Sequence, residues 1–537
     1  MLAGAPSIAP EAPLAPRAHA LWAERERIAT WIGLVLLLAV QSFALARQRA
    51  PYLEDDGAFF LRYAENIAAG NGYRWNPGEA PVWGASAPLW PLFLAAGIEA
   101  GLTPAQSSLV WSVGFALAAS LVLGLAARRV FGVVGLFALT PLLALNFLYS
   151  TWATSGLESP LTFLLVALAV WKRDRSVRAL VTAGAIAGLG YGLLAWYFGT
   201  PVPNSFLRKL STSYGNIPRT WFAQMALIAG AGWLRSSLAV AGAFALRRRP
   251  EVATVALAAV LVPTVAYTLK PPSEGFLWYP AAISGAVAFL AAGGIAFLVE
   301  RVPARSWGWL RPVAASAALI ALALFLEREE MPRVRGWQRF LASSIPTMRA
   351  GGEWVDEHLP ADARVMTGWG HPAHASRRFV YDSSFLNRRP EDGNLREKYQ
   401  PEAIIQLVQV PLEEHPVPRN YRRAKVFVPP EGSHLAFTAV AVFVREDVPV
   451  DGVAAKPPLS DPVAPVAPVA QEPLLPEGWA RALTRQLLAG ASDEVPDPDP
   501  RLLRRLSELI AQRRELSDPP ESLALLEQRI RDVEAGR

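Results

Sequence analysis

The sequence predicts an α-helical polytopic membrane protein with about nine spans, followed by a small C-terminal α/β domain and a helical tail. Three observations lead to this prediction. Of the 537 residues, 52% are hydrophobic and only 18% are charged, and the mean hydropathy is +0.23. The apolar residues are concentrated before about residue 326, and short basic clusters separate them. This distribution excludes a single soluble globule.

About nine apolar segments have close to the roughly 20 residues that a helix needs to cross the hydrocarbon core, and they define a transmembrane domain over 28–326. The first is expected to remain as an anchor, because Arg47 and Arg49 follow it and no small-residue cleavage site stands out. Segment 221–246 contains Arg235, so it is either one span or an interfacial helix followed by a short span. The segments are 28–46, 105–127, 130–150, 157–171, 179–198, 221–246, 252–269, 279–299 and 312–326.

The basic clusters predict the orientation of these spans. They fall in every second loop, as expected for loops on the cytoplasmic side. The N-terminal tail 1–27 is therefore placed inside, whereas the loop 47–104 and everything after 326 are placed outside. Within that loop, the apolar segment 88–102 is interpreted as a helix on the outer surface. The clusters are Arg128 and Arg129, then Lys172, Arg173, Arg175 and Arg178, then Arg247 to Arg249, and finally Arg301, Arg305 and Arg311.

The composition changes after the last span, where residues 327–448 are expected to form an extracytoplasmic α/β domain. Gly351 to His358 is amphipathic and ends at a Leu-Pro pair, which indicates a helix. The Pro/Ala-rich stretch 449–477 predicts an extended linker, and 478–537 predicts a helical tail. Five β-branched or aromatic runs predict strands, at Ala363 to Met366, Phe379 to Tyr381, Ala403 to Leu407, Lys425 to Val428 and Phe437 to Val444.

Composition and charge also exclude several classes of function. The absence of cysteine removes disulfide scaffolds, thiolate zinc sites and cysteine nucleophiles. The net charge of +6 does not indicate a nucleic-acid partner, because the basic residues lie in clusters between apolar segments. A transporter would be expected to have internal repeats and polar groups at mid-membrane depth, and the sequence suggests neither.

Polar functional groups gather in the first outer loop, where Asp55 and Asp56 follow the first span directly. An adjacent pair of carboxylates can act as a general base or hold a divalent cation. The alternative is that one of them caps the predicted helix 57–69. His371 and His374 resemble metal ligands in their spacing, but without supporting carboxylates we interpret them as part of a surface loop.

The run EDDGAFFLRYAENIAAGNGYRWNPGEAPVWGASAPLWPLFL, at residues 54–94, resembles the first outer loop of GT-C-fold membrane glycosyltransferases. The resemblance is closest to the terminal arabinofuranosyltransferase-like proteins of bacterial envelopes, and it covers roughly residues 28–445. Three further stretches match in order, namely Thr154 to Glu158, Tyr197 to Gly199 with Pro203 to Ser205 and Lys209, and Trp354 to Leu386. The residues of the first loop that match are Asp55, Asp56, Arg62, Tyr63, Asn66, Gly70, Gly72, Asn76, Pro77, Gly78, Glu79, Gly84, Pro88 and Trp90.

The resemblance implies transfer of a sugar from a polyprenyl-phosphate donor to a glycan, lipid or protein acceptor at the outer face of the bacterial inner membrane. Asp55 would be the general base, and Asp56 would orient it or bind a divalent cation, the only candidate cofactor. Each remaining candidate also has a structural alternative, as an interfacial cation, a first-turn residue or a turn former. The residues expected to bind substrate are Arg62, Asn66, Glu79, Glu158, Asn204, Lys209 and Lys270, of which Arg62, Lys209 and Lys270 would contact the donor phosphate.

The chain departs from this family in two places. One helical hairpin is missing, because Arg178 to Leu194 leads directly into Tyr197. Trp83 and Ala85 stand where the family has Glu and an aromatic residue, which predicts a different acceptor. The alternative function is therefore that of a catalytically degenerate relative, which binds lipid-linked sugar or a partner without turnover.

Overall fold

The computed structural model describes residues 16–49, 51–85, 87–172, 177–205, 233–269, 278–301, 310–388, 395–408, 415–430 and 439–450. The chain divides into two compact units, Met1–Ser433 with Phe437–Ala454, and His434–Ala436 with Ala455–Arg537. All the described residues belong to the first unit. The expected helical tail and the expected linker from residue 451 onward lie outside them.

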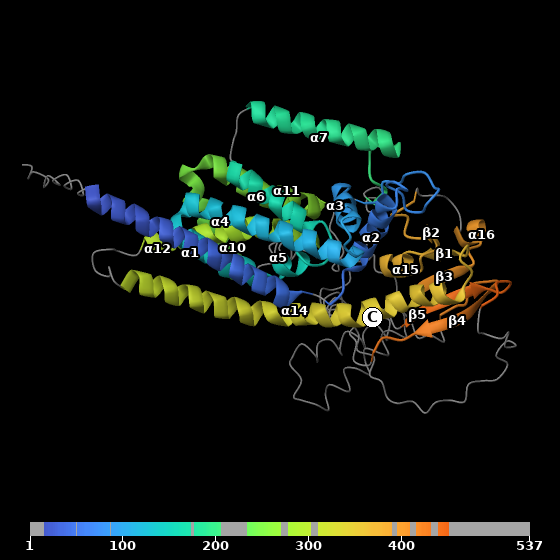
Figure 1. Cartoon of the computed structure of the whole chain (residues 1–537). Helices are drawn as coiled ribbons and strands as arrows, with labels where there is room; N and C mark the ends of the chain where they lie inside the picture. The colour runs from blue at the N-terminus through green and yellow to red at the C-terminus, as the bar shows by residue number, and fades with distance from the viewer. Residues whose placement is uncertain are drawn as a thin grey trace, which may run out of the picture. The chain divides into compact units, whose positions relative to one another are not determined.

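Apolar helices make up the larger part of this unit (Figure 1). Within the described residues, three helical segments are long and apolar enough to cross a membrane, at Ala23–Gln48, Pro104–Ala144 and Ile283–Glu300. The helical membrane character predicted from composition is therefore supported. The helices are α1 (Pro16–Gln48), α4 (Pro104–Ala144), α5 (Phe147–Trp152), α6 (Ser159–Lys172), α7 (Val177–Phe198), α10 (Trp233–Ala245), the 3₁₀ helix η1 (Leu246–Arg248), α11 (Pro250–Leu269) and α12 (Trp278–Glu300).

Helix α4 contains a reversal of the chain at Gly132, between the expected segments 105–127 and 130–150. Gly132 has φ 73° and ψ −166°, a left-handed conformation that glycine adopts readily. A Cβ atom on Gly124 would lie 3.2 Å from Leu136 Cδ1, although a straight helix would separate these residues by about 18 Å. The two halves of α4 therefore pack against each other, as the separate expected segments require.

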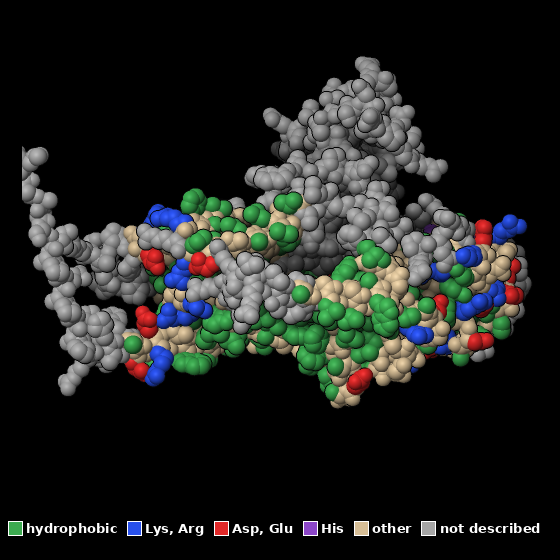
Figure 2. Space-filling view, turned by 90° about the horizontal axis from the view of Figure 1, so that it is seen from above, with side chains coloured by type: hydrophobic (Ala, Val, Ile, Leu, Met, Phe, Trp, Pro, Cys, Tyr) green, Lys and Arg blue, Asp and Glu red, His purple; other side chains and the backbone are tan. Residues whose placement is uncertain are grey.

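The surface of the helical part is apolar. Figure 2 shows hydrophobic side chains along the helices and charged side chains gathered toward both ends of the view. Large exposed hydrophobic residues include Val35, Phe43 and Val110, which are 64%, 65% and 53% accessible. Exposed apolar patches of this extent are typical of surfaces that contact lipid or another protein.

Helices α10 and α12 cross at two glycines. A methyl group on Gly242 would overlap the carbonyl group of Leu290, and a methyl group on Gly294 would overlap the carbonyl group of Leu238. Small residues at such crossings allow membrane helices to approach closely.

Replacing Gly242 with alanine should therefore lower the stability of the protein in detergent by about 1–3 kcal/mol, because the added methyl group has no space against the backbone. Gly114→Ala is the matched control, since Gly114 lies in α4 with no neighbouring atom within 4 Å of the position that a methyl group would take. This control should be neutral or stabilising by about 0.5–1 kcal/mol. Equal unfolding temperatures for the two variants would contradict the crossing.

Two helices lie in the segment 47–104, which is the expected first outer loop: α2 (Asp55–Ala68) and α3 (Leu89–Glu99). They agree with the helices expected at 57–69 and 88–102. The structure differs from the prediction at α14 (Leu310–His358), which runs as one helix through the expected domain boundary at 326. The amphipathic stretch from Gly351 to His358 is therefore the last part of this helix rather than a separate element.

The predicted α/β domain contains a five-stranded sheet in the order β2-β1-β3-β5-β4. Strand β1 pairs in parallel with β2 and β3, whereas β5 pairs antiparallel with β3 and β4. All five runs expected as strands coincide with strands, and Phe443 and Val408 are buried in the core of the sheet. The elements are β1 (Arg364–Thr367), α15 (Gly370–Ala375), β2 (Phe379–Asp382), α16 (Leu395–Tyr399), β3 (Ala403–Val408), β4 (Tyr421–Phe427) and β5 (Ala439–Arg445).

Candidate functional site

The stretches of the outer loops that resemble the glycosyltransferase family lie together in the structure. The N–H of Glu54, before α2, donates to the carbonyl of Ser155 at 2.8 Å. The indole Nε1 of Trp90, in α3, donates to the carbonyl of Gly156 at 2.9 Å. The N–H of Asn204 donates to the carbonyl of Trp83 at 2.8 Å. Two stretches that are far away in the sequence, at residues 155–156 and at Asn204, thus contact the segment 54–94.

Asp55 connects α2 to the part of the chain that contains the five-stranded sheet, called the sheet domain from here on. Its Oδ2 accepts the N–H of Gly370 at 2.9 Å, and its Oδ1 accepts the N–H of His371 at 2.8 Å. These N–H groups begin helix α15, where a carboxylate also interacts favourably with the helix dipole. Gly370 has no space for a side chain, because a Cβ atom would overlap the carbonyl of Asp55. Asp55 therefore holds α15 against the start of α2.

The structure does not place Asp55 or Asp56 at the N-cap of α2. The residue at the N-cap of α2 is Glu54, and its side chain makes no capping hydrogen bond. Asp55 and Asp56 occupy the first turn of α2 instead. The carboxylate of Asp55 is used by α15, which lies more than 300 residues away in the sequence.

The carboxyl groups at this end of α2 influence one another. Burial raises the pKa of Asp55 from 3.8 to about 7 against the lowering effect of its two N–H donors, and the charges of Asp56 and Asp382 raise it further. Burial, together with the charges of Asp56 and Asp55, also holds the pKa of Glu54 well above its ordinary value. A carboxyl group with a pKa near 7 is suited to proton transfer at neutral pH.

The pKa of Asp55 predicts a pH dependence of stability. Between pH 3.8 and about 7 the folded protein retains a proton on Asp55 that the unfolded chain releases, so the contribution of Asp55 to stability falls as pH rises through this interval. The unfolding temperature of the wild type relative to Asp55→Asn, which cannot ionise, should therefore be higher at pH 5 than at pH 8. A difference that is constant or increases with pH would contradict the assignment.

Arg62 is buried and makes four hydrogen bonds to protein acceptors. Its Nε donates to the Trp75 carbonyl at 2.9 Å, and its Nη1 donates to the Ala373 carbonyl at 2.8 Å. Its Nη2 donates to Asn76 Oδ1 and to the Arg378 carbonyl, both at 2.7 Å. Burial lowers the pKa of Arg62 to about 10, so the guanidinium stays charged at neutral pH. We therefore assign Arg62 to docking of the sheet domain rather than to the expected binding of the donor phosphate.

Asp55 and Arg62 contact the two ends of α15. They lie seven residues apart, so they share one face of α2. Asp55 accepts from the first residues of α15, and Arg62 donates to Ala373 near its last residues. Both charges have the sign that the dipole of α15 favours.

The side chains of Asn66 and Asn76 are also hydrogen-bonded to other groups of the protein. Asn66 Nδ2 donates to the carbonyls of Arg74 and Trp75, at 2.9 and 3.1 Å. Asn76 accepts the N–H of Val380 and donates to its carbonyl, at 2.9 and 3.0 Å, and it also donates to Glu79 Oε2 at 2.7 Å. Asn66 and Glu79, both expected to bind substrate, thus shape the loop that contacts β2.

The interpretation of His371 as part of a surface loop is wrong. The residue is 5% exposed, and its Nε2 lies 3.1 Å from the carbonyl oxygen of Leu53. Burial lowers the pKa of His371 to about 4, so the imidazole is neutral at pH 7. His374 is less buried and lies 3.1 Å from Glu65 Oε2. Both histidines contact residues in or next to α2 rather than forming a loop exposed to solvent.

Asp382, at the end of β2, is a buried residue of the site that sequence analysis missed. Its oxygens accept from the N–H and hydroxyl of Ser384 and from the N–H and amide of Asn387. Burial raises the pKa of Asp382 despite these donors. The Asp-Ser-Ser sequence typical of a tight turn was the available signal.

Of the four other residues expected to bind substrate, the structure describes Glu158 and Asn204. Glu158 precedes α6 and lies near Tyr73. Burial raises the pKa of Tyr73, and the charges of Tyr63 and Glu158 raise it further. Asn204 is 4% exposed and lies next to Trp83. Lys209 and Lys270 lie outside the described residues.

The residues at this site do not fit a divalent cation. Both oxygens of Asp55 already accept backbone N–H groups. Among the residues that the structure describes, no group of three or more His, Asp or Glu side chains could hold a metal ion. No step proposed below involves a cation.

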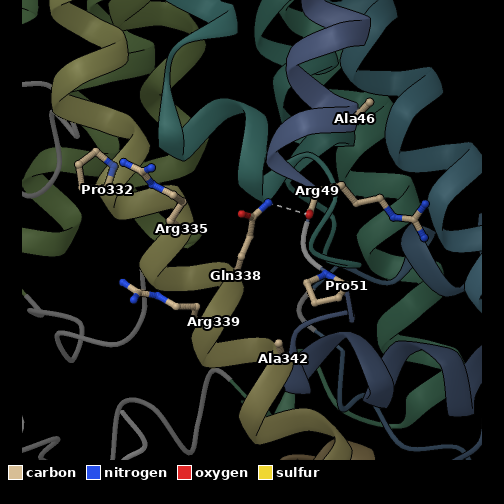
Figure 3. Close-up of a pocket in the computed structure, with 8 residues that line it drawn as sticks. All are labelled: Ala46, Arg49, Pro51, Pro332, Arg335, Gln338, Arg339 and Ala342. Atoms are coloured by element: carbon tan, nitrogen blue, oxygen red, sulfur yellow. Dashed lines mark hydrogen bonds between the residues drawn. The ribbon is translucent and has the colours of Figure 1, made fainter. Parts of the chain in front are cut away.

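A separate open groove lies between the end of α1 and α14 (Figure 3). Gln338 donates to the carbonyls of Arg47 and Arg49, at 3.1 and 3.0 Å, and so joins the two helices. In Figure 3 the guanidinium groups of Arg335 and Arg339 point away from the side chain of Arg49. The three cations do not converge on one ligand. The groove is lined by Ala46, Arg49, Pro51, Pro332, Arg335, Gln338, Arg339 and Ala342.

Comparison of the chain with protein-family models and with curated proteins gives no match. A functional hypothesis therefore depends on the geometry of the carboxyl groups at α2 and on the resemblance of the outer loops.

Proposed function

We propose that the protein is a membrane glycosyltransferase of the GT-C type with about nine spans. It transfers a sugar from a polyprenyl-phosphate donor to a glycan, lipid or protein acceptor at the outer face of a bacterial inner membrane, and its sheet domain is extracytoplasmic. The observation that carries the proposal is the group of three carboxyl side chains at the start of α2, Glu54, Asp55 and Asp56, together with Asp382 at the end of β2, whose charge acts on Asp55. The proposal is supported by the contact of Glu54 with Ser155, in a second stretch that resembles the family.

In the proposed reaction the acceptor hydroxyl attacks the anomeric carbon of the donor sugar. The bond from that carbon to the phosphate oxygen breaks, and the phosphate leaves with the electron pair. The proton of the hydroxyl passes to a carboxylate, because a hydroxyl is a poor nucleophile at neutral pH. The proposal thus requires one carboxylate that can accept the proton of the acceptor.

We assign this role to Asp56 and a positioning role to Asp55, the reverse of the expectation from sequence. Both oxygens of Asp55 already accept backbone N–H groups that hold α15. Asp56 is rotated by about 100° around α2 and does not share the face that Asp55 and Arg62 present to α15. Its charge raises the pKa of Asp55 and of Glu54, so it lies close to both.

The test is incubation of the purified protein with a panel of polyprenyl-phosphate sugars. Consumption of one donor, with a new glycosidic product when an envelope acceptor is added, is the expected result. Binding of a donor without consumption would favour the degenerate relative, and neither binding nor consumption would overturn the proposal.

A further inference from the structure

Three buried polar atoms in and next to the loop 47–104 have no hydrogen-bond partner among the residues that the structure describes. They are Tyr73 Oη, Trp83 Nε1 and Ser205 Oγ. Their residues are only 7%, 2% and 6% exposed. A buried polar group without a partner is costly, so native proteins rarely retain several together without a reason.

Tyr73 and Trp83 meet at Phe198, and Ser205 follows a residue that is hydrogen-bonded to Trp83. The Trp83 ring stacks on Phe198 with centroids 5.4 Å apart, and Tyr73 contacts it edge-on at 5.1 Å. Ser205 follows Asn204, whose N–H donates to the carbonyl of Trp83. Residues from the outer loop, from the end of α7 and from the segment after α7 thus form one cluster.

The cluster reaches solvent at its edge. Tyr197, whose ring lies 4.9 Å from Phe198, is 41% exposed. Tyr197 Oη also accepts the N–H of Tyr73 at 3.2 Å, so the exposed residue is directly joined to the buried ones. Gly199 and Pro201, beside it, are exposed as well. A ligand can therefore approach from this side.

We propose that Tyr73, Trp83 and Ser205 form a subsite for the ring of a sugar. A sugar ring presents an apolar face that packs on aromatic rings and a rim of hydroxyls that both donate and accept hydrogen bonds. An indole N–H, a phenol and a serine hydroxyl are suitable partners for that rim. The inference deepens the proposed function, because it names the residues that recognise carbohydrate near the carboxyl group of Glu158, whose charge acts on Tyr73.

The substitution Tyr73→Phe separates a sugar subsite from ordinary core packing. It removes only the unpartnered hydroxyl, so it should leave the unfolding temperature unchanged or raise it. Loss of one hydrogen bond to the ligand should weaken sugar binding about tenfold. Ser205→Ala and Trp83→Phe should each weaken binding similarly. Tyr421→Phe is the matched control, because Tyr421 Oη donates to the Pro401 carbonyl at 2.8 Å far from the cluster; it should lower stability and leave binding unchanged.

The measurement is ligand-observed saturation-transfer NMR on the full chain in detergent. One arm uses methyl glycosides of the panel sugars, and the other uses short-chain polyprenyl-phosphate sugars. Binding of glycosides alone would assign the subsite to the acceptor, and binding of the phosphate sugars alone would assign it to the donor. Failure of every probe to bind the wild type, or unchanged binding in all three variants, would overturn the inference. Binding that depends on these residues without any transfer would retain the subsite and overturn the proposed turnover.

Discussion

Replacing Asp56 with asparagine is expected to reduce turnover by at least about two orders of magnitude while the protein remains folded. Asparagine keeps the size of the side chain but cannot take the proton of the acceptor hydroxyl, and positioned general-base catalysis contributes about 10²–10⁴-fold. The cost in stability should be below about 1 kcal/mol, since the change keeps the shape of the side chain and removes one first-turn charge from α2. Donor consumption by wild type and variant at equal protein concentration measures the effect.

Asp55→Asn is the informative comparison, because it is expected to fail for a different reason. Asparagine can accept the N–H of Gly370 or of His371, but its amide group then faces the other donor. One buried hydrogen bond is lost, at a cost of about 1–3 kcal/mol. We expect lower stability with a smaller loss of turnover at a temperature where the variant is folded. Near-normal turnover in Asp56→Asn with collapse in a folded Asp55→Asn would return the role of base to Asp55.

The pKa of Asp55 provides a second measure of the role of Asp56. Because the charge of Asp56 raises that pKa, Asp56→Asn should move the pH dependence of stability toward lower pH. If the charge of Asp56 did not act on Asp55, the pH dependence of stability would be the same in Asp56→Asn as in the wild type.

Local patterns in the sequence predicted those parts of the fold that local physics determines. The strands β3 and β5 are rich in apolar and β-branched residues, and pairing within the sheet buries most of their side chains on both faces. Helices α2 and α3 were likewise expected from their apolar spacing. The continuity of α14 was missed because Pro332 and the charges after Leu326 indicate an end, whereas the helix continues into the sheet domain.

The site depends on contacts that no local pattern contains. Asp55 meets Gly370 and His371 across more than 300 residues, and Arg62 meets Ala373 across a similar separation. Sequence analysis assigned Asp55 to catalysis and Arg62 to the donor phosphate. The structure shows that both side chains are hydrogen-bonded to α15, a contact that sequence analysis did not anticipate.

Arg62→Met should produce the largest loss of stability, about 3 kcal/mol or more, because it leaves four protein acceptors without their charged donor. Arg62→Lys should recover little, since an ammonium group cannot reproduce the planar fork that contacts four acceptors at once. A phosphate-binding cation would tolerate lysine better.

The effect of Arg62→Met should be concentrated at α15. Without the guanidinium, α15 keeps Asp55 at its start but loses the donor near its end, so the amide groups of residues 370–378 should exchange with deuterium faster than in the wild type. Arg349→Met is the control, because Arg349 forms an exposed ion pair with Glu353, and such pairs contribute about 0–1 kcal/mol. If the unfolding temperature and exchange rates of Arg62→Met fall within the range of this control, the stability of the sheet domain does not depend on the hydrogen bonds that α2 makes to α15.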